Sequence, residues 1–160
     1  MRKILEAIAL AALGAQAWLT YSALLSPESL PQRFPMHFDA AGNANAWGSR
    51  ATLLVVPAVA ITIYLLFTVV TRFPSAFNYP VVVTLKNRAR LQTLALNMIA
   101  WLKMELICLF TWIQWATIQV ARHPRQQLPA SLMPITLVAV FSTIAFYTVA
   151  MFTTKAGGPD

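Results

Sequence analysis

The sequence predicts an all-α membrane protein with four transmembrane helices, and three observations support this fold class. Among 160 residues, 58% are hydrophobic and only 11% are charged, and the mean hydropathy is +0.62. Soluble domains carry about 25% charged residues, so the charges here are too few to cover a soluble surface. The chain also contains four apolar runs of about 20 residues, the length at which a helix crosses a bilayer. Polar segments separate these runs, as connections between spans would.

The first predicted span covers residues 4–25, and Arg2 and Lys3 precede it. A cleavable signal peptide is the alternative, because the Ala-Gln-Ala sequence at residues 15–17 offers a cleavage site after a short apolar core. We favour an uncleaved span because the apolar character continues to residue 25. Both interpretations place the following loop, residues 26–51, outside the cytoplasm.

The remaining spans are predicted at residues 52–70, 96–120 and 133–152. The second connection, residues 71–93, is basic and contains no acidic residue. We expect helix to begin at Leu85, with Thr84 as its N-cap. The third helix would then be longer than the bilayer is thick, and its first turns would extend into the cytoplasm. Residues 1–160 would form one four-helix domain.

The distribution of Lys and Arg predicts that both termini are cytoplasmic, since cytoplasmic loops carry an excess of these residues. In that orientation seven cations lie inside, namely Arg2, Lys3, Arg72, Lys86, Arg88, Arg90 and Lys155, and four lie outside, namely Arg33, Arg50, Arg122 and Arg125. The formal net charge of +7 therefore reflects topology. It does not indicate nucleic-acid binding, because the cations flank apolar runs instead of forming one basic face.

The third span carries a polar stripe. Its members follow one another at spacings of 4, 4, 3, 4, 3 and 4 and are Asn97, Trp101, Glu105, Cys108, Trp112, Trp115 and Gln119. This spacing places them on one side of a helix, which we expect to face the bundle interior. One interpretation is hydrogen bonding between helices, with tryptophan filling space. The other makes Glu105 a site for a proton or a cation, because an ionisable group inside a membrane is often functional.

Two further charges lie inside predicted spans. Lys103 is two residues from Glu105, so the two side chains point to different sides of the helix and should not pair. We expect Lys103 to reach toward the inner interface, as long cationic side chains do near the end of a span. Glu6 lies in the first turn of the first helix, where we expect the headgroup region to keep it hydrated.

The outer loop allows a chemical and a structural interpretation. In an extended segment His37 and Asp39 would project to the same side, and with His123 they would form a metal site or, as a pair, an acid–base catalyst. Two histidines in the whole chain and no tight ligand spacing argue against this interpretation. We therefore predict no catalytic residue, no metal and no cofactor.

The structural interpretation makes the outer loop an ordered cap. Pro31 and Pro35 favour an extended entrance, and residues 39–43 have turn chemistry in which Gly42 can adopt a positive φ. Trp47 is amphipathic and suits the outer membrane interface.

The loop pattern Leu-Pro-x-x-Phe-Pro-x-His-Phe-Asp-x-x-Gly, followed by Trp-Gly-Ser-Arg, resembles a bacterial membrane-domain family of unknown function. This domain also forms the N-terminal part of SdpI-type immunity and signalling proteins. The matching positions are Leu30, Pro31, Pro35, His37, Phe38, Asp39, Gly42, Trp47, Gly48 and Arg50. Residues 77–80, 101–103 and 114–115 are similar to further blocks of small four-span relatives. The resemblance implies an integral protein of the bacterial cell membrane.

We predict a non-enzymatic binding, sensing or immunity-type module that presents residues 30–50 outside the cytoplasm. The alternative is a small ion-coupled transporter that uses Glu105. The partners we expect are the lipid bilayer, an envelope protein or peptide at the outer loop and a second copy of the chain, without nucleic acid. The predicted location is the bacterial inner or plasma membrane, which the chain crosses several times.

Overall fold

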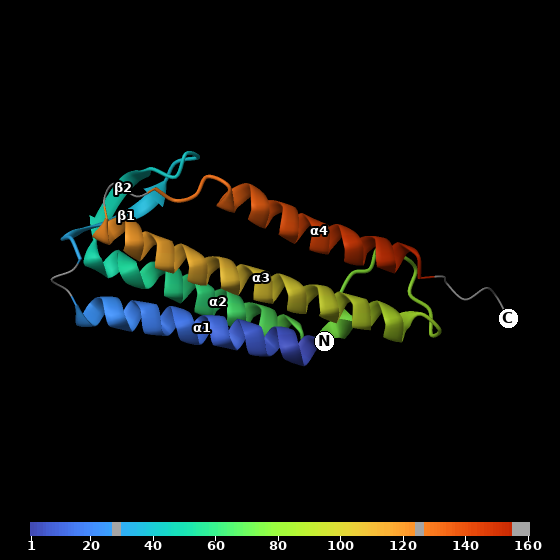
Figure 1. The fold of residues 1–160 in the computed structure, drawn as a ribbon. Coiled ribbons are helices and arrows are strands. Elements are labelled where there is room, and N and C mark those ends of the chain that lie inside the picture. The colour runs from blue at the N-terminus through green and yellow to red at the C-terminus, as the bar shows by residue number, and fades with distance from the viewer. Residues whose placement is uncertain (27–29, 124–126, 155–160) are drawn as a thin grey trace.

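A computed structural model describes residues 1–26, 30–123 and 127–154, and within these ranges the chain forms four long helices and one small hairpin (Figure 1). The helices are α1 (Arg2–Leu25), α2 (Val55–Val70), α3 (Arg88–Arg122) and α4 (Leu132–Phe152). The hairpin strands are β1 (Arg33–Phe38) and β2 (Ala44–Ser49), and the short 3-10 helices are η2 (Arg50–Leu54) and η3 (Pro74–Ala76).

Each of the four long helices is long and apolar enough to cross a membrane. For the second span, this count includes η2 together with α2. Their outer faces carry large apolar side chains that a soluble protein would bury. Ile4 is 65% exposed, Leu65 is 55% exposed and Val138 is 67% exposed. Such faces suit lipid, in which only the backbone hydrogen bonds of helices or closed barrels are satisfied. The chain is therefore a multi-pass membrane protein.

Helix α3 is the central helix of the bundle. It packs against α1, α2 and α4, whereas α4 packs mainly against α3. The start of α1 and the end of α4 lie at the end of the bundle away from the hairpin, and the first turns of α3 extend beyond the start of α1 (Figure 1). We call the two ends the hairpin end and the terminal end.

The start of α3 differs from the sequence prediction. The helix begins at Arg88, three residues after Leu85. The backbone N–H of Thr84 donates to Asn87 Oδ1 at 2.8 Å, and the backbone N–H of Asn87 donates to Thr84 Oγ1 at 3.3 Å. These reciprocal bonds hold residues 84–87 as a turn. Thr84 therefore stabilises the entrance to the helix without being its N-cap.

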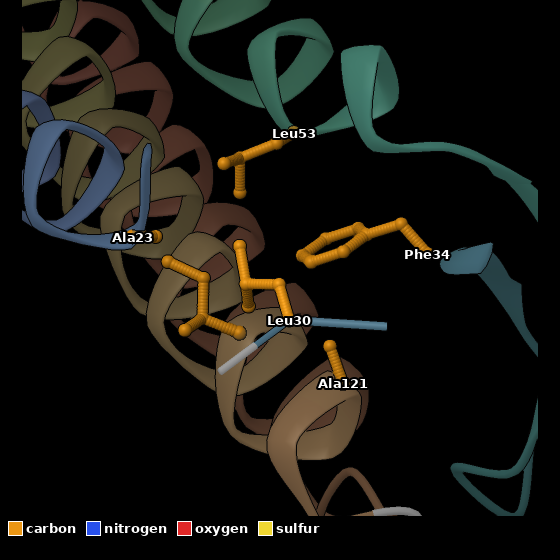
Figure 2. Packing of buried hydrophobic residues seen from close by; sticks show 6 residues of the cluster. Ala23, Leu30, Phe34, Leu53 and Ala121 are labelled. Atoms are coloured by element: carbon orange, nitrogen blue, oxygen red, sulfur yellow. The ribbon is translucent and has the colours of Figure 1, made fainter. Parts of the chain in front are cut away.

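Three apolar clusters hold the bundle together. The cluster at the hairpin end joins α1, the hairpin, η2 and α3 through Ala23, Leu30, Phe34, Leu53, Ile118 and Ala121 (Figure 2). In the middle, Ala9 of α1 and Ala60 of α2 surround Ile107 of α3. Alanine allows the helix backbones to approach closely, which is how helices associate within lipid. At the terminal end, Leu91 and Ala95 of α3 pack with Met151 of α4.

The loop between α1 and α2 contains a β-hairpin, which the all-α prediction did not include. Strands β1 and β2 are antiparallel, with Phe34 opposite Gly48 and Pro35 opposite Trp47, and the register is irregular around His37. Residues 33–49 of this loop are ordered by strand pairing as well as by the turn.

Candidate functional site

The hairpin is anchored to the helices at its base. Phe34 is only 1% exposed and inserts into the cluster at the hairpin end (Figure 2). Arg50, where η2 begins, donates from Nε to the Pro31 carbonyl at 3.2 Å and from Nη2 to the Leu30 carbonyl at 2.8 Å. One guanidinium thus joins the entrance and the exit of the loop, in the forked geometry that arginine provides and lysine lacks.

The turn of the hairpin is built around Asp39. Its Oδ1 accepts the backbone N–H groups of Ala41 and Asn43, each at 2.9 Å. The hydrogen bonds from Asn43 in particular hold the pKa of the Asp39 carboxyl below its ordinary value, because they stabilise the charged form. The prediction of a positive φ at Gly42 is confirmed, with a value of 83°.

The tip of the hairpin docks onto the connection between α3 and α4. The backbone N–H of Leu128 donates to the Gly42 carbonyl at 2.9 Å, and Gln127 Nε2 donates to Asn43 Oδ1 at 2.7 Å. A Cβ atom on Gly42 would lie 1.9 Å from the Leu128 carbonyl oxygen. Both the positive φ and the close approach of Leu128 therefore require glycine at this position.

The structure does not bring His37, Asp39 and His123 together as one site. His37 is exposed, and its Nδ1 lies 2.6 Å from Asn45 Oδ1 on the facing strand. The Asp39 carboxylate faces its own turn, and His123 is the residue that ends α3. Within residues 1–26, 30–123 and 127–154, no group of three or more His, Cys, Asp or Glu side chains could hold a metal ion.

Two large apolar side chains of the hairpin are exposed, Met36 at 56% and Trp47 at 44%. Gly48 makes room for Met36, since a Cβ atom on Gly48 would lie 2.3 Å from Met36 Sδ. The hairpin also covers a cavity of about 110 Å³ lined by Phe34, Met36 and Gln114, among others. The hairpin is thus supported by the helices and still exposes two large apolar side chains.

The polar stripe of α3 lies partly toward α4. Thr143 Oγ1 of α4 donates to Glu105 Oε1 at 2.6 Å. Glu105 Oε2 is buried and has no hydrogen-bond partner among the described residues. Trp101 and Thr143 border a cavity of about 370 Å³. Of the remaining stripe residues, Trp115 is 43% exposed and the others are half-buried, namely Asn97, Cys108, Trp112 and Gln119.

The expectation for Lys103 was wrong, whereas Glu6 stays partly exposed, as expected, with its side chain 37% exposed. Lys103 is 4% exposed and its Nζ lies 2.5 Å from Glu6 Oε2. Nζ also donates to Thr68 Oγ1 at 3.2 Å and lies 4.6 Å from the centre of the Tyr64 ring, while the Tyr64 hydroxyl donates to Glu6 Oε1. Groups from α1 and α2 thus converge on one lysine of α3. They compensate its desolvation, so the side chain has no need to reach the interface.

Sequence reasoning also missed Gln114, which is fully buried. Its Nε2 donates to Thr20 Oγ1 at 3.0 Å and to the Leu53 carbonyl at 3.1 Å. Its position could have been inferred from the apolar residues around it in the span, because an amide in such surroundings needs hydrogen-bond partners on other helices.

Comparison with known proteins finds one matching protein-domain family, and the matching segment includes the hairpin. Residues 7–61 match a domain of unknown function, DUF1648. This segment comprises most of α1, the hairpin and the first part of α2. An uncharacterized protein of Archaeoglobus fulgidus is 38% identical over 84 residues, which cover 48% of this chain and 43% of that protein. The chain thus spans less than half the length of this relative. No solved structure matches the chain.

Proposed function

We propose that this protein is a non-enzymatic binding or sensing module of a cell membrane, with the hairpin as its binding surface. The observation that carries the proposal is a hairpin anchored at its base and its tip that leaves Met36 and Trp47 exposed. Anchoring lowers the entropy lost on binding, and tryptophan and methionine are enriched at protein interfaces. An immunity-type role would be one form of this function.

The proposal places the hairpin outside the cytoplasm and both termini inside. It is supported by the basic connection between α2 and α3, since Arg72, Lys86, Arg88 and Arg90 lie at the terminal end. Such an excess of cations is typical of cytoplasmic segments. A bacterial source remains a prediction, because the relative we describe is archaeal.

The polar groups of the loop motif support binding more than catalysis. The carboxylate of Asp39, the guanidinium of Arg50 and one ring nitrogen of His37 each have a hydrogen-bond partner within the loop. These bonds give the motif residues a structural role. Met36 and Trp47 are the large apolar side chains of the hairpin that are left to meet a partner.

Photo-crosslinking in intact cells tests this proposal. A benzophenone amino acid at position 36 or 47 should yield the same protein or peptide adduct, which appears as a heavier band and is identified by mass spectrometry. The same probe at Val138, which is 67% exposed on α4, serves as a lipid-facing control. Crosslinks to lipid alone at positions 36 and 47 would reject the binding surface. Labelling of Ser49→Cys only from the cytoplasmic side would reject the orientation.

A proton- or ion-coupled carrier is the second candidate, and it is favoured by the unpartnered Oε2 of Glu105. An unpartnered carboxylate oxygen inside a membrane span is a candidate binding group for a transported proton or cation. Under this proposal Glu105→Gln abolishes coupled flux in proteoliposomes. Thr143→Val removes one hydrogen bond but keeps the carboxylate, so its flux should persist. Equal flux by Glu105→Gln and the unmodified protein would reject the carrier.

A further inference from the structure

A groove at the terminal end of the bundle is formed by two adjoining cavities, which share Phe77 and Tyr79. The first, of about 600 Å³, lies between α3 and α4 and is lined by Ile99, Thr148 and Met151, among others. The second, of about 500 Å³, is lined by Ser75, Thr84, Arg88 and Gln92, among others. One part is therefore apolar, and the other ends in a cation and several polar groups.

The apolar side chains around the groove indicate its depth in the membrane. In the connection from α2 to α3, Leu85 is 94% exposed, Val82 is 76% exposed and Phe73 is 60% exposed. Side chains of this kind are buried at the boundary between headgroups and acyl chains when a segment lies in the membrane interface. The cavity that Arg88 borders then lies at headgroup depth. The apolar cavity between α3 and α4 lies at acyl-chain depth.

The charge at the groove indicates the sign of its ligand. Residues 71–104 contain no Asp or Glu, whereas Arg72, Lys86, Arg88 and Arg90 fall within them. A guanidinium binds phosphate oxygens through two parallel hydrogen bonds, and basic segments beside a span attract anionic lipids. A free phosphate would use only the Arg88 part of the groove, whereas a phospholipid would use both parts.

We propose that this groove binds one anionic phospholipid, with its phosphate at Arg88 and an acyl chain between α3 and α4. The open side of α4 makes this geometry accessible, because α4 packs mainly against α3. The proposal depends on membrane insertion alone and is independent of what the hairpin binds.

Native mass spectrometry of the full chain, released from nanodiscs of phosphatidylcholine and phosphatidylglycerol in a 3:1 ratio, tests the proposal. The unmodified protein should retain one phosphatidylglycerol in preference to phosphatidylcholine. Arg88→Gln should reduce this preference about fivefold, the effect of one cation at an anionic surface. Arg90→Gln removes an equal charge two residues away, outside the groove lining, and should change the preference less than twofold.

Thr148→Phe separates a lipid from a free anion. It fills the apolar cavity and keeps Arg88, so lipid retention should fall while binding of inorganic phosphate, measured by calorimetry, stays unchanged. Thr136→Phe, at the hairpin end of α4, is the matched control and should retain lipid. Equal retention of both lipids by the unmodified protein, or equal losses for Arg88→Gln and Arg90→Gln, would overturn the proposal. Circular dichroism confirms that each variant is folded.

Discussion

The buried pair between Glu6 and Lys103 predicts an asymmetry between two single substitutions. The Lys103 side chain is 6% exposed, whereas that of Glu6 is 37% exposed. Removing one partner of a buried ion pair costs about 3–5 kcal/mol, because the other charge is left buried and uncompensated. That penalty applies in full only to the charge that cannot reach water. It should therefore be large when Lys103 is left alone and small when Glu6 is left alone.

Glu6→Gln should lower the free energy of unfolding by about 3 kcal/mol, since Lys103 then has only neutral partners among the described residues, Thr68 and the Tyr64 ring included. Lys103→Met should lower it by about 1 kcal/mol, the value for a pair whose remaining partner is partly solvated. The double variant leaves no charge unpaired, so its stability should lie within about 1 kcal/mol of the unmodified protein. The two substitutions should thus be strongly non-additive.

Reversible unfolding in mixed micelles, followed by circular dichroism over a titration with SDS, measures these free energies. Lys3→Met removes an exposed cation from the same end of the bundle and should change stability by less than about 0.5 kcal/mol. The reasoning would be refuted if both single substitutions cost the same and the double variant showed their sum. That result would mean that the pair is solvated and does not join α1 to α3.

Two further predictions concern the hairpin. Gly42→Ala should destabilise the protein by more than about 1 kcal/mol, because alanine is strained at positive φ and its Cβ would collide with Leu128. Gly14→Ala is the control and should be neutral or stabilising, because nothing lies within 4 Å of the added Cβ. Equal unfolding midpoints for the two variants would contradict this prediction. The pKa of Asp39 is lowered in the folded protein, so the ionised carboxylate stabilises the hairpin. This stabilisation is complete at a pH above the ordinary carboxyl pKa of about 3.9, and it is lost as the pH falls through the lower pKa of the folded state. Amide exchange at Ala41 and Asn43 should therefore quicken, relative to helix amides, in that acidic window, and Asp39→Asn should show no such pH-dependent step.

The helices were predictable because composition and length alone decide whether a segment can cross a bilayer. The hairpin was not, because its strands lack the features on which strand prediction relies. Strand β1 contains Pro35, and β2 contains Gly48, both of which are unfavourable in strands. Buried residues also fail to alternate with exposed ones, since Phe34 and Pro35 are adjacent and both buried. The turn around Gly42 was predictable because its chemistry is local.

The ion pair and the buried amide were not predictable because both depend on how helices rotate about their axes. Glu6 and Lys103 are separated by two connections and lie in different spans. The spacing of Lys103 and Glu105 within one helix predicts that the two side chains do not pair. Such spacing cannot identify a partner on another helix. The polar stripe likewise described one side of α3, whereas Lys103 and Gln114 are buried on the sides that meet α1 and α2.

Helix α3 lies outside the segment that matches DUF1648 but supplies hydrogen-bond and packing partners for it. That segment, residues 7–61, contains Gln16 and Thr20 of α1, which bond to Phe110 and Gln114 of α3. Thr111 of α3 also donates to the Ala12 carbonyl at 3.0 Å. In lipid a polar group without a partner costs several kcal/mol, and α1 and α2 alone would leave the Gln16 side-chain amide without its partner on α3. The hairpin also rests on Ile118 and Ala121 of α3. The position of the hairpin therefore depends on a helix outside the matched segment.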